Sequence, residues 1–221
     1  MSEFFLELFS EEIPANLQNK TRKDFLQNFK EFLEKEEIKY SGEATAFSIP
    51  NRLIVYFQNI SKSIIKKENE IRGPNINAPQ VALNGFLKSY KITIDKTFKK
   101  KTDKGVFYFF KRPSESIETK SILQKNLPRI LDKISWKKSM RWADHELYWG
   151  RPLKSILCCF DNKTLEFVYH HLVSSNITFI DKDFEKKTRK FVSFKDYLAF
   201  FKSKNIILDN KKREQFIEDQ L

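Results

Sequence analysis

Apolar runs alternate with charged segments in the first third of the chain. Residues 3–9 are nearly all apolar, which predicts a buried strand. From Pro14 to about Glu37, apolar side chains recur every three or four residues, which predicts an amphipathic helix. Two short apolar runs, 44–48 and 53–60, then flank a turn at Pro50-Asn51. The chain therefore opens with a predicted β-α-β-β unit, a sheet covered by a helix.

The later pattern is more interrupted. Gly73-Pro74 is expected to end the opening unit and, with Arg72, to form a hinge before the next helix. If Gly73 has a positive φ, a substitution by Val should cost about 1 kcal/mol or more. The same periodicities predict helices at 82–90, 115–134, 193–204 and 210–221. They also predict strands at 106–111, 155–160 and 164–169, the last two as a hairpin. Pro128 should kink or split the second of these helices, and Ser193 is the expected N-cap of the third.

These elements predict an α+β fold in three segments. The first is the β-α-β-β unit at residues 1–72, and the second is a mixed α/β unit at 73–180. The third, 181–221, is a charged segment followed by helices, with the boundary placed in the highly charged stretch 181–190.

Composition narrows the class of protein. The 221 residues contain 41 Lys+Arg against 29 Asp+Glu, a net charge of +12, which would attract a polyanion such as RNA. However, 32 of the cations are Lys and only 9 are Arg, which is the excess that an AT-rich genome produces. Codon bias therefore explains the net charge about as well as RNA binding does. No apolar run approaches the roughly 20 residues of a membrane span, and the start lacks the pattern of a signal peptide. A cytoplasmic location without membrane contact is expected.

The sequence shows no autonomous active site. It lacks both common Gly-rich phosphate loops, and its three histidines do not have the spacing of metal ligands, since neighbours on a strand face opposite sides. Cys158-Cys159 lie inside an apolar run, where a core role is favoured over a nucleophile. A nucleotidyltransferase would need a pair of carboxylates at a strand end, and Glu7 has no such partner. No catalytic residue, metal or bound cofactor is therefore expected.

The positive signal is a cluster of basic and aromatic residues. Residues 120–155 contain nine basic and three acidic side chains together with all three tryptophans. Arginine pairs with phosphate through two hydrogen bonds, and Trp stacks on unpaired bases, so RNA contact is one interpretation. The other is that the tryptophans form a core or an interface while the basic side chains are solvated. The three-residue spacing of Lys138 and Arg141 would place them together on a helical turn, while Met140 and Trp142 would share a packed face.

Several motifs, in order and at compatible spacing, resemble one family. They are Phe5-Leu6-Glu7-Leu8-Phe9-Ser10-Glu11-Glu12-Ile13-Pro14, Pro50-Asn51-Arg52-Leu53, Arg72-Gly73-Pro74, Lys137-Lys138-Ser139-Met140-Arg141-Trp142 and Trp149-Gly150-Arg151-Pro152-Leu153. Together they resemble the N-terminal region of the β subunit of bacterial α2β2 glycyl-tRNA synthetase. This chain departs from the pattern at Asn51, where the family has a basic residue, and in lacking a Gly-His-Arg-Phe element after Leu172.

The resemblance implies a component of glycine–tRNA ligase that is not catalytic alone. In this family the α subunit uses ATP to activate glycine, and the β subunit supplies tRNA binding. The implied fold is similar to the body and tail domains of archaeal CCA-adding enzymes, and the implied partners are the α subunit and tRNA(Gly), with no DNA. Two hypotheses stay open: contact with tRNA, or a structural scaffold for the α subunit without RNA contact. The candidate residues for either surface are Arg52, Arg72, Lys137, Lys138, Arg141, Trp142 and Arg151.

Overall fold

The computed structural model describes residues 2–66, 68–180 and 188–221. The chain forms two compact units, Met1–Ile64 together with Glu118–Leu221, and Ile65–Ile117. Helices and antiparallel strands are mixed in both, which confirms the α+β class. The three segments expected from sequence have other boundaries, because the chain leaves the first unit after β3 and returns to the same sheet at β9. The charged residues 181–187 lie outside the described residues.

A five-stranded antiparallel sheet forms the centre of the first unit, in the order β10-β9-β1-β3-β2. Its strands are β1 (Ser2–Ser10), β2 (Ala44–Ile49), β3 (Arg52–Ile60), β9 (Leu153–Phe160) and β10 (Lys163–Thr164). The strand β1 lies in the middle, where Leu6 pairs with Val55 on one side and Cys158 on the other.

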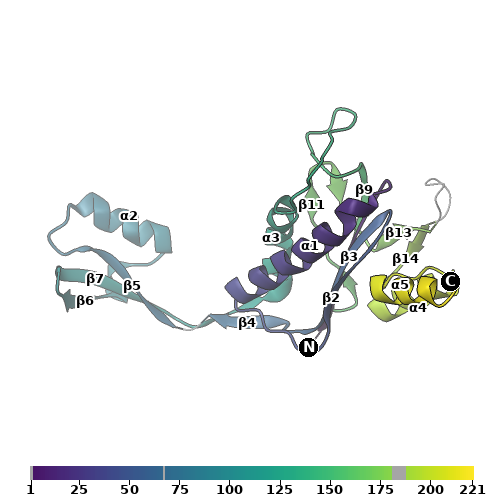
Figure 1. Cartoon of the computed structure of the whole chain (residues 1–221). Helices are drawn as coiled ribbons and strands as arrows, with labels where there is room; N and C mark the ends of the chain where they lie inside the picture. The colour runs from purple at the N-terminus through teal and green to yellow at the C-terminus, as the bar shows by residue number, and fades with distance from the viewer. Residues whose placement is uncertain (1, 67, 181–187) are drawn as a thin grey trace. The chain divides into compact units, whose positions relative to one another are not determined.

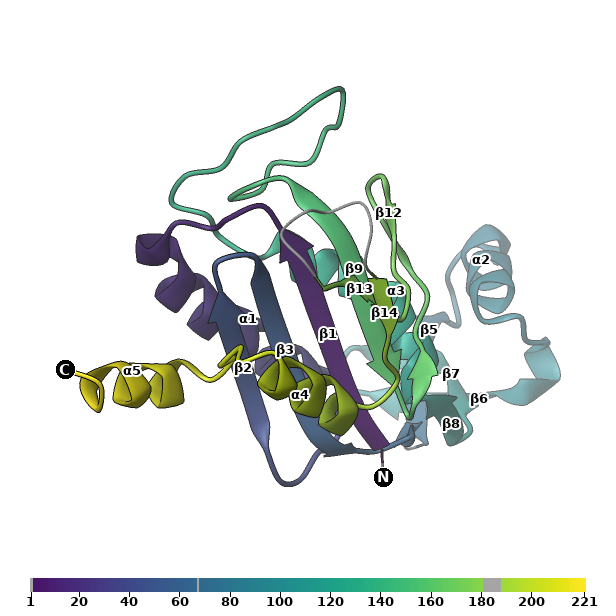
Figure 2. The same ribbon diagram turned by 90° about the vertical axis from the view of Figure 1, so that its right-hand side faces the viewer.

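Helices cover both faces of this sheet. The helices α1 (Ala15–Lys35) and α3 (Thr119–Asp132) lie on one face, and α4 (Phe194–Ser203) lies on the other (Figure 2). The ring of Phe4 is 5.5 Å from that of Phe29 in α1, and the ring of its neighbour Phe5 is 5.5 Å from that of Phe194 in α4. Successive side chains of a strand point to opposite faces, so burial of both faces explains the continuous apolar run at 3–9.

Short elements complete the first unit (Figure 1). The pairs β11 (Val168–Tyr169) with β12 (Leu172–Val173) and β13 (Ile177–Phe179) with β14 (Thr188–Lys190) are small antiparallel ribbons. The helix α5 (Asn210–Glu218) follows α4. As predicted, the Ser193 side chain caps α4 by accepting a hydrogen bond from the backbone N–H of Asp196.

The second unit is a three-stranded antiparallel sheet with one helix. Its strands β5 (Asn69–Asn75), β6 (Thr97–Thr102) and β7 (Gly105–Arg112) have the order β5-β7-β6. The helix is α2 (Gln80–Tyr90), and a 3₁₀ turn, η1 (Ile94–Lys96), precedes β6. The strands through which the chain enters and leaves, β4 (Ser63–Lys66) and β8 (Glu115–Glu118), pair with each other.

Three expectations for local structure were wrong. Residues 115–118 form β8, so the helix predicted from 115 begins only at Thr119. The helix α3 then continues through Pro128 without the expected split, because Leu127, Ile130 and Leu131 are buried on both sides of the proline. The strand predicted at 164–169 is interrupted, and only β10 continues the hairpin with β9.

Gly73 and Pro74 do not form the expected turn. They lie within β5, at a register shift between Arg72 and Asn75 in the pairing with β7. Proline has no N–H for a strand ladder and is tolerated at such a bulge. The only glycines with positive φ among the described residues are Gly42 and Gly105, so Gly73 has no conformational need to be glycine. The reason is steric: a Cβ at Gly73 would lie 2.9 Å from the ring of Phe86 in α2.

Gly73→Val is therefore expected to destabilise the second unit by about 1–3 kcal/mol through overpacking against Phe86. Gly85→Ala in α2 is the matched control, since a Cβ there meets nothing within 4 Å. Alanine should raise stability at that position by roughly 0.5–1 kcal/mol. Thermal and urea unfolding of the two variants measure the difference, and equal stabilities would contradict the steric explanation.

Candidate functional site

The basic and aromatic cluster lies on a long loop between α3 and β9. We call residues 133–152 the basic loop, and Figure 2 shows that it extends beyond the end of the central sheet. Met140 and Trp149 close its inner part as an antiparallel bridge, with N–O distances of 2.8 and 3.1 Å. The bridge therefore brings the two ends of segment 141–148 together, so that this segment forms a closed loop.

Tryptophan side chains anchor the base of this loop. Trp149 is only 2% exposed, and its ring lies 5.1 Å from that of Trp136 and 6.1 Å from that of Tyr169. A Cβ on Gly150 would lie 2.3 Å from the Trp136 ring, so glycine is needed for this close approach. The core interpretation of the tryptophans is therefore correct for Trp149.

The outer part of the loop presents cations. The side chains of Lys137, Lys138 and Arg141 are exposed, and among the described residues no ion pair is recorded for any of them. Arg151 is half-buried, and its Nη1 donates to the carbonyl of Gly150 at 3.1 Å. This contact holds one end of the guanidinium in place.

Exposed nonpolar surface lies beside these cations. Met140 is 42% exposed and Tyr148 is 63% exposed. The surface thus combines positive charge with aromatic and sulfur-containing side chains, a mixture that suits both RNA and protein partners.

Three rings gather on one side of the loop. The imidazoles of His145 and His171 stack with centroids 3.5 Å apart and planes within 2°, and Trp142 meets both edge-on at 6.2 and 5.9 Å. Burial lowers the pKa of His171, and the neighbouring His145 and His170 lower it further. The lowered pKa favours the neutral form of His171 at neutral pH.

This geometry corrects several expectations. Residues 137–141 are not helical, so Lys138 and Arg141 are not brought together by a helical turn, although both stay exposed. Met140 is exposed instead of packed, and Trp142 is half-buried. His170 and His171 occupy the turn between β11 and β12 instead of a strand. The His145–His171 stack joins residues far apart in the sequence, and only their residue type could have suggested it.

The candidate arginines outside the loop lie elsewhere. Arg72 is exposed on β5 of the second unit, with its Cζ 3.6 Å from the centroid of the Phe107 ring. Arg52, at the start of β3, is 3% exposed, and its guanidinium lies between the rings of Phe9 and Phe201 at 4.5 and 4.8 Å. Arg52 therefore belongs to the core of the first unit and does not join the loop surface.

Arg52 is part of a buried polar cluster centred on Glu7. The Arg52 Nε donates to a carboxylate oxygen of Glu7 at 3.0 Å, and the hydroxyls of Thr178 and Tyr197 also donate to that carboxylate. The remaining Arg52 nitrogens donate to the Phe179 carbonyl and, at 3.0 Å, to the Asn51 side chain. We call Glu7, Arg52, Thr178 and Tyr197 the Glu7 cluster. Burial, reinforced by the Glu7 charge, raises the pKa of Tyr197. Sequence reasoning considered Glu7 but missed these partners.

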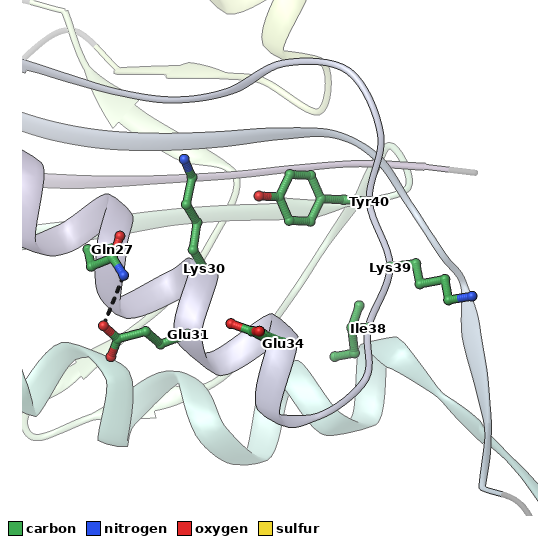
Figure 3. A pocket seen from close by; sticks show the side chains of 7 residues that line it. All are labelled: Gln27, Lys30, Glu31, Glu34, Ile38, Lys39 and Tyr40. Carbon is green, nitrogen blue, oxygen red and sulfur yellow. Dashed lines mark hydrogen bonds between the residues drawn. The ribbon is translucent and has the colours of Figure 1, made fainter.

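Other candidate chemistry is weak. Among the described residues, no group of three or more His, Cys, Asp or Glu is arranged to hold a metal ion. Burial raises the pKa of Cys159 to about 12 and that of Cys158 well above its usual value, which agrees with a core role. A pocket of about 520 Å³ lies between α1 residues 27–34 and residues 38–40 (Figure 3). Lysine and glutamate side chains mix there, and Gln27 donates to Glu31 at 3.0 Å, so the pocket has no single preferred charge.

Comparison with known proteins identifies the family. The model of the family described as "Glycyl-tRNA synthetase beta subunit" matches residues 4–221. The chain belongs to this family. The glycine–tRNA ligase beta subunit of Rickettsia prowazekii (strain Madrid E) is 37% identical over 219 residues, which are 99% of this chain and 32% of the relative. That of Rickettsia felis is 36% identical over 223 residues, covering 100% and 33%.

The glycyl-tRNA synthetase beta subunit family is the one that the motifs indicated, so that prediction is confirmed. The chain spans about a third of the length of the curated relatives it matches. Among the helices that the structure describes, none has the length and apolar content to cross a membrane.

Proposed function

We propose that this chain acts in ATP-dependent glycyl-tRNA synthesis as a tRNA-binding part of a beta subunit, with the basic loop as its contact surface. Three exposed cations, Lys137, Lys138 and Arg141, carry the proposal, because they form no ion pair with any residue that the structure describes and phosphate groups would neutralise them. Two further residues of the same loop add to this surface. The guanidinium of Arg151 is fixed by its hydrogen bond to the Gly150 carbonyl, and the ring of Trp142 is partly exposed. Family membership supports tRNA(Gly) as the RNA.

In this proposal the chain is not catalytic alone. Glycine activation and ATP use belong to the α subunit, its proposed partner, and the complex works in the cytoplasm. No residue of this chain is assigned to catalysis, to a metal or to a cofactor.

A second candidate function is docking on the α subunit without RNA contact. The exposed side chains of Met140 and Tyr148 favour it, since such residues are enriched at protein interfaces. The two functions predict different responses to salt. RNA binding through several phosphates weakens steeply as salt rises, whereas an interface built on Met and Tyr does not.

The double variant Lys138→Ala/Arg141→Ala tests the proposal. It is expected to weaken binding to tRNA(Gly) and to flatten the salt dependence by about one unit for each lost phosphate contact. Stability should change by less than about 0.5 kcal/mol, because both side chains are exposed. The matched control is Lys23→Ala/Lys35→Ala on α1, which removes two other exposed cations.

Titrations at several salt concentrations measure both effects. If the loop variant and the control bind tRNA alike while the loop variant alone loses affinity for the α subunit, docking is the better assignment. If neither affinity changes, the basic loop has no binding role.

A further inference from the structure

Among the described residues of the second unit, a helix covers only one of the two faces of the sheet. In α2, the ring of Tyr90 lies 6.3 Å from that of Phe110, and Phe86 lies against Gly73, so α2 covers the face that carries Phe110. Successive side chains of β7 point to opposite faces, so Phe109, next to Phe110, lies on the face away from α2, and so does Phe107. Their paired neighbours Phe98, Lys100 and Arg72 share that face. We call Arg72, Phe98, Lys100, Phe107 and Phe109 the open face.

The open face consists of rings with cations placed over them. Phe98 stacks on Phe109 with centroids 6.0 Å apart and an angle of 28° between the planes. The Cζ of Arg72 lies 3.6 Å above the centre of Phe107, and the Nζ of Lys100 lies 5.5 Å from the centre of Phe109. Phe98 is itself 38% exposed, so part of its ring stays available to a ligand. Aromatic rings and guanidinium planes are the groups on which unpaired bases stack.

Positive charge concentrates in the same unit. Residues 65–117 contain twelve basic and five acidic side chains, which is more than half of the chain's net charge of +12 in a quarter of its length. The edge strand β6 carries three consecutive exposed lysines, Lys99, Lys100 and Lys101. Lys100 pairs with Glu70 at 2.5 Å, whereas no ion pair is recorded for Lys99 or Lys101 among the described residues.

We propose that the open face binds single-stranded RNA at the β6 edge of the sheet, with an unpaired base on Phe98. Lys99 and Lys101 pair with Tyr108 and Val106, so they lie on the other face, and the phosphates reach them around the edge strand β6. An acidic protein partner would use the lysines alone, whereas a single strand uses both the lysines and the rings. An RNA duplex, whose bases are stacked internally, cannot use Phe98. The inference rests on the proposed function in taking RNA as the ligand, but it uses a surface separate from the basic loop.

Phe98→Leu in the full chain tests the stacking step. Leucine keeps an apolar cover over Phe109 and removes the ring. With a single-stranded oligouridylate of twelve nucleotides as probe, affinity should fall about tenfold, the effect of losing one base–aromatic stack. Binding of a blunt RNA duplex should stay the same. Val81→Ala on α2, at an exposed apolar position of the same unit, is the control, and a thermal melt of each variant verifies folding.

Lys99→Gln/Lys101→Gln tests the phosphate step. The salt dependence of oligouridylate binding should flatten by about 0.7 for each lost contact, as expected for single strands. Lys88→Gln/Lys91→Gln, two exposed lysines at the end of α2, removes the same charge elsewhere in the unit. Equal slopes for the two double variants would overturn the placement of phosphates on β6.

The outcomes separate this inference from the proposed function. If Phe98→Leu binds oligouridylate as the parent does, or if the parent does not bind it, the open face is not an RNA surface. The basic loop is still supported in that case, provided that Lys138→Ala/Arg141→Ala weakens tRNA binding. If the open-face variants lose oligouridylate while the loop variant binds tRNA normally, the proposed role of the loop fails and the open face remains.

Discussion

Arg52→Met is expected to destabilise the first unit by about 3–5 kcal/mol, because it leaves the buried carboxylate of Glu7 without its cation. Arg52 and Glu7 are both almost fully buried, at 3% and 0% exposure, so water cannot replace the lost partner. The substitution also frees the Phe179 carbonyl, which accepts from Arg52. Unfolding in urea, followed by circular dichroism, measures the loss.

A second substitution separates charge from packing. Arg52→Lys keeps the positive charge but cannot reach Glu7, Phe179 and Asn51 together, since an ammonium lacks the fork of the guanidinium. The free energy of unfolding of Arg52→Lys should therefore lie between that of the parent and that of Arg52→Met. If the Met variant unfolds at the same urea concentration as the parent, the Glu7 cluster does not hold the unit together.

Trp149→Ala is expected to cost about 3–5 kcal/mol, the usual range for truncating a large buried aromatic side chain. Trp149 packs on Trp136 and Tyr169 at the base of the basic loop, so its removal leaves a cavity there. Trp142→Ala is the comparison within the same loop. Trp142 is half-buried and contacts mainly the rings of His145 and His171, so its truncation should cost clearly less.

The loss of tRNA affinity should follow the opposite order from the loss of stability, with the larger effect at Trp142. At a temperature where both variants are folded, Trp142→Ala should weaken tRNA binding more, because the Trp142 side chain is partly exposed whereas that of Trp149 is buried. Equal melting temperatures for the two variants would contradict the assignment of Trp149 as the anchor.

The elements that sequence could predict are those with a clear apolar pattern, either a helix with one buried face or a strand that is apolar throughout, such as β1. In α1, residues Leu17, Phe25 and Phe29 are buried, and their spacing is visible without the structure. The strands β5 and β6 were missed because they belong to a small sheet with an exposed face, where Lys99 to Lys101 read as a charged segment. The short pair β13 and β14 has no periodicity to detect, since each strand has three residues.

The candidate site was predictable in composition and not in geometry. Lys137, Lys138 and Arg141 are exposed, as a basic cluster suggests, but the loop conformation depends on the Met140–Trp149 bridge and on Trp136 against Gly150. Arg52 illustrates the other limit. Its motif suggested a surface role, whereas its partners Glu7 and Tyr197 come from β1 and α4, at opposite ends of the sequence.

The topology of the central sheet also sets the order in which its strands can pair while the chain is being synthesised on the ribosome. The middle strand β1 pairs with β3 soon after it emerges, but its other edge waits for β9, whose Cys158 pairs with Leu6. At about 5–20 residues per second, the residues between β3 and β9 take on the order of ten seconds to translate. During that interval, an apolar strand edge with Phe4, Phe5 and Leu6 stays open to pairing with other chains. The strand β1 therefore gains its second partner, β9, only after residue 160 has emerged from the ribosome.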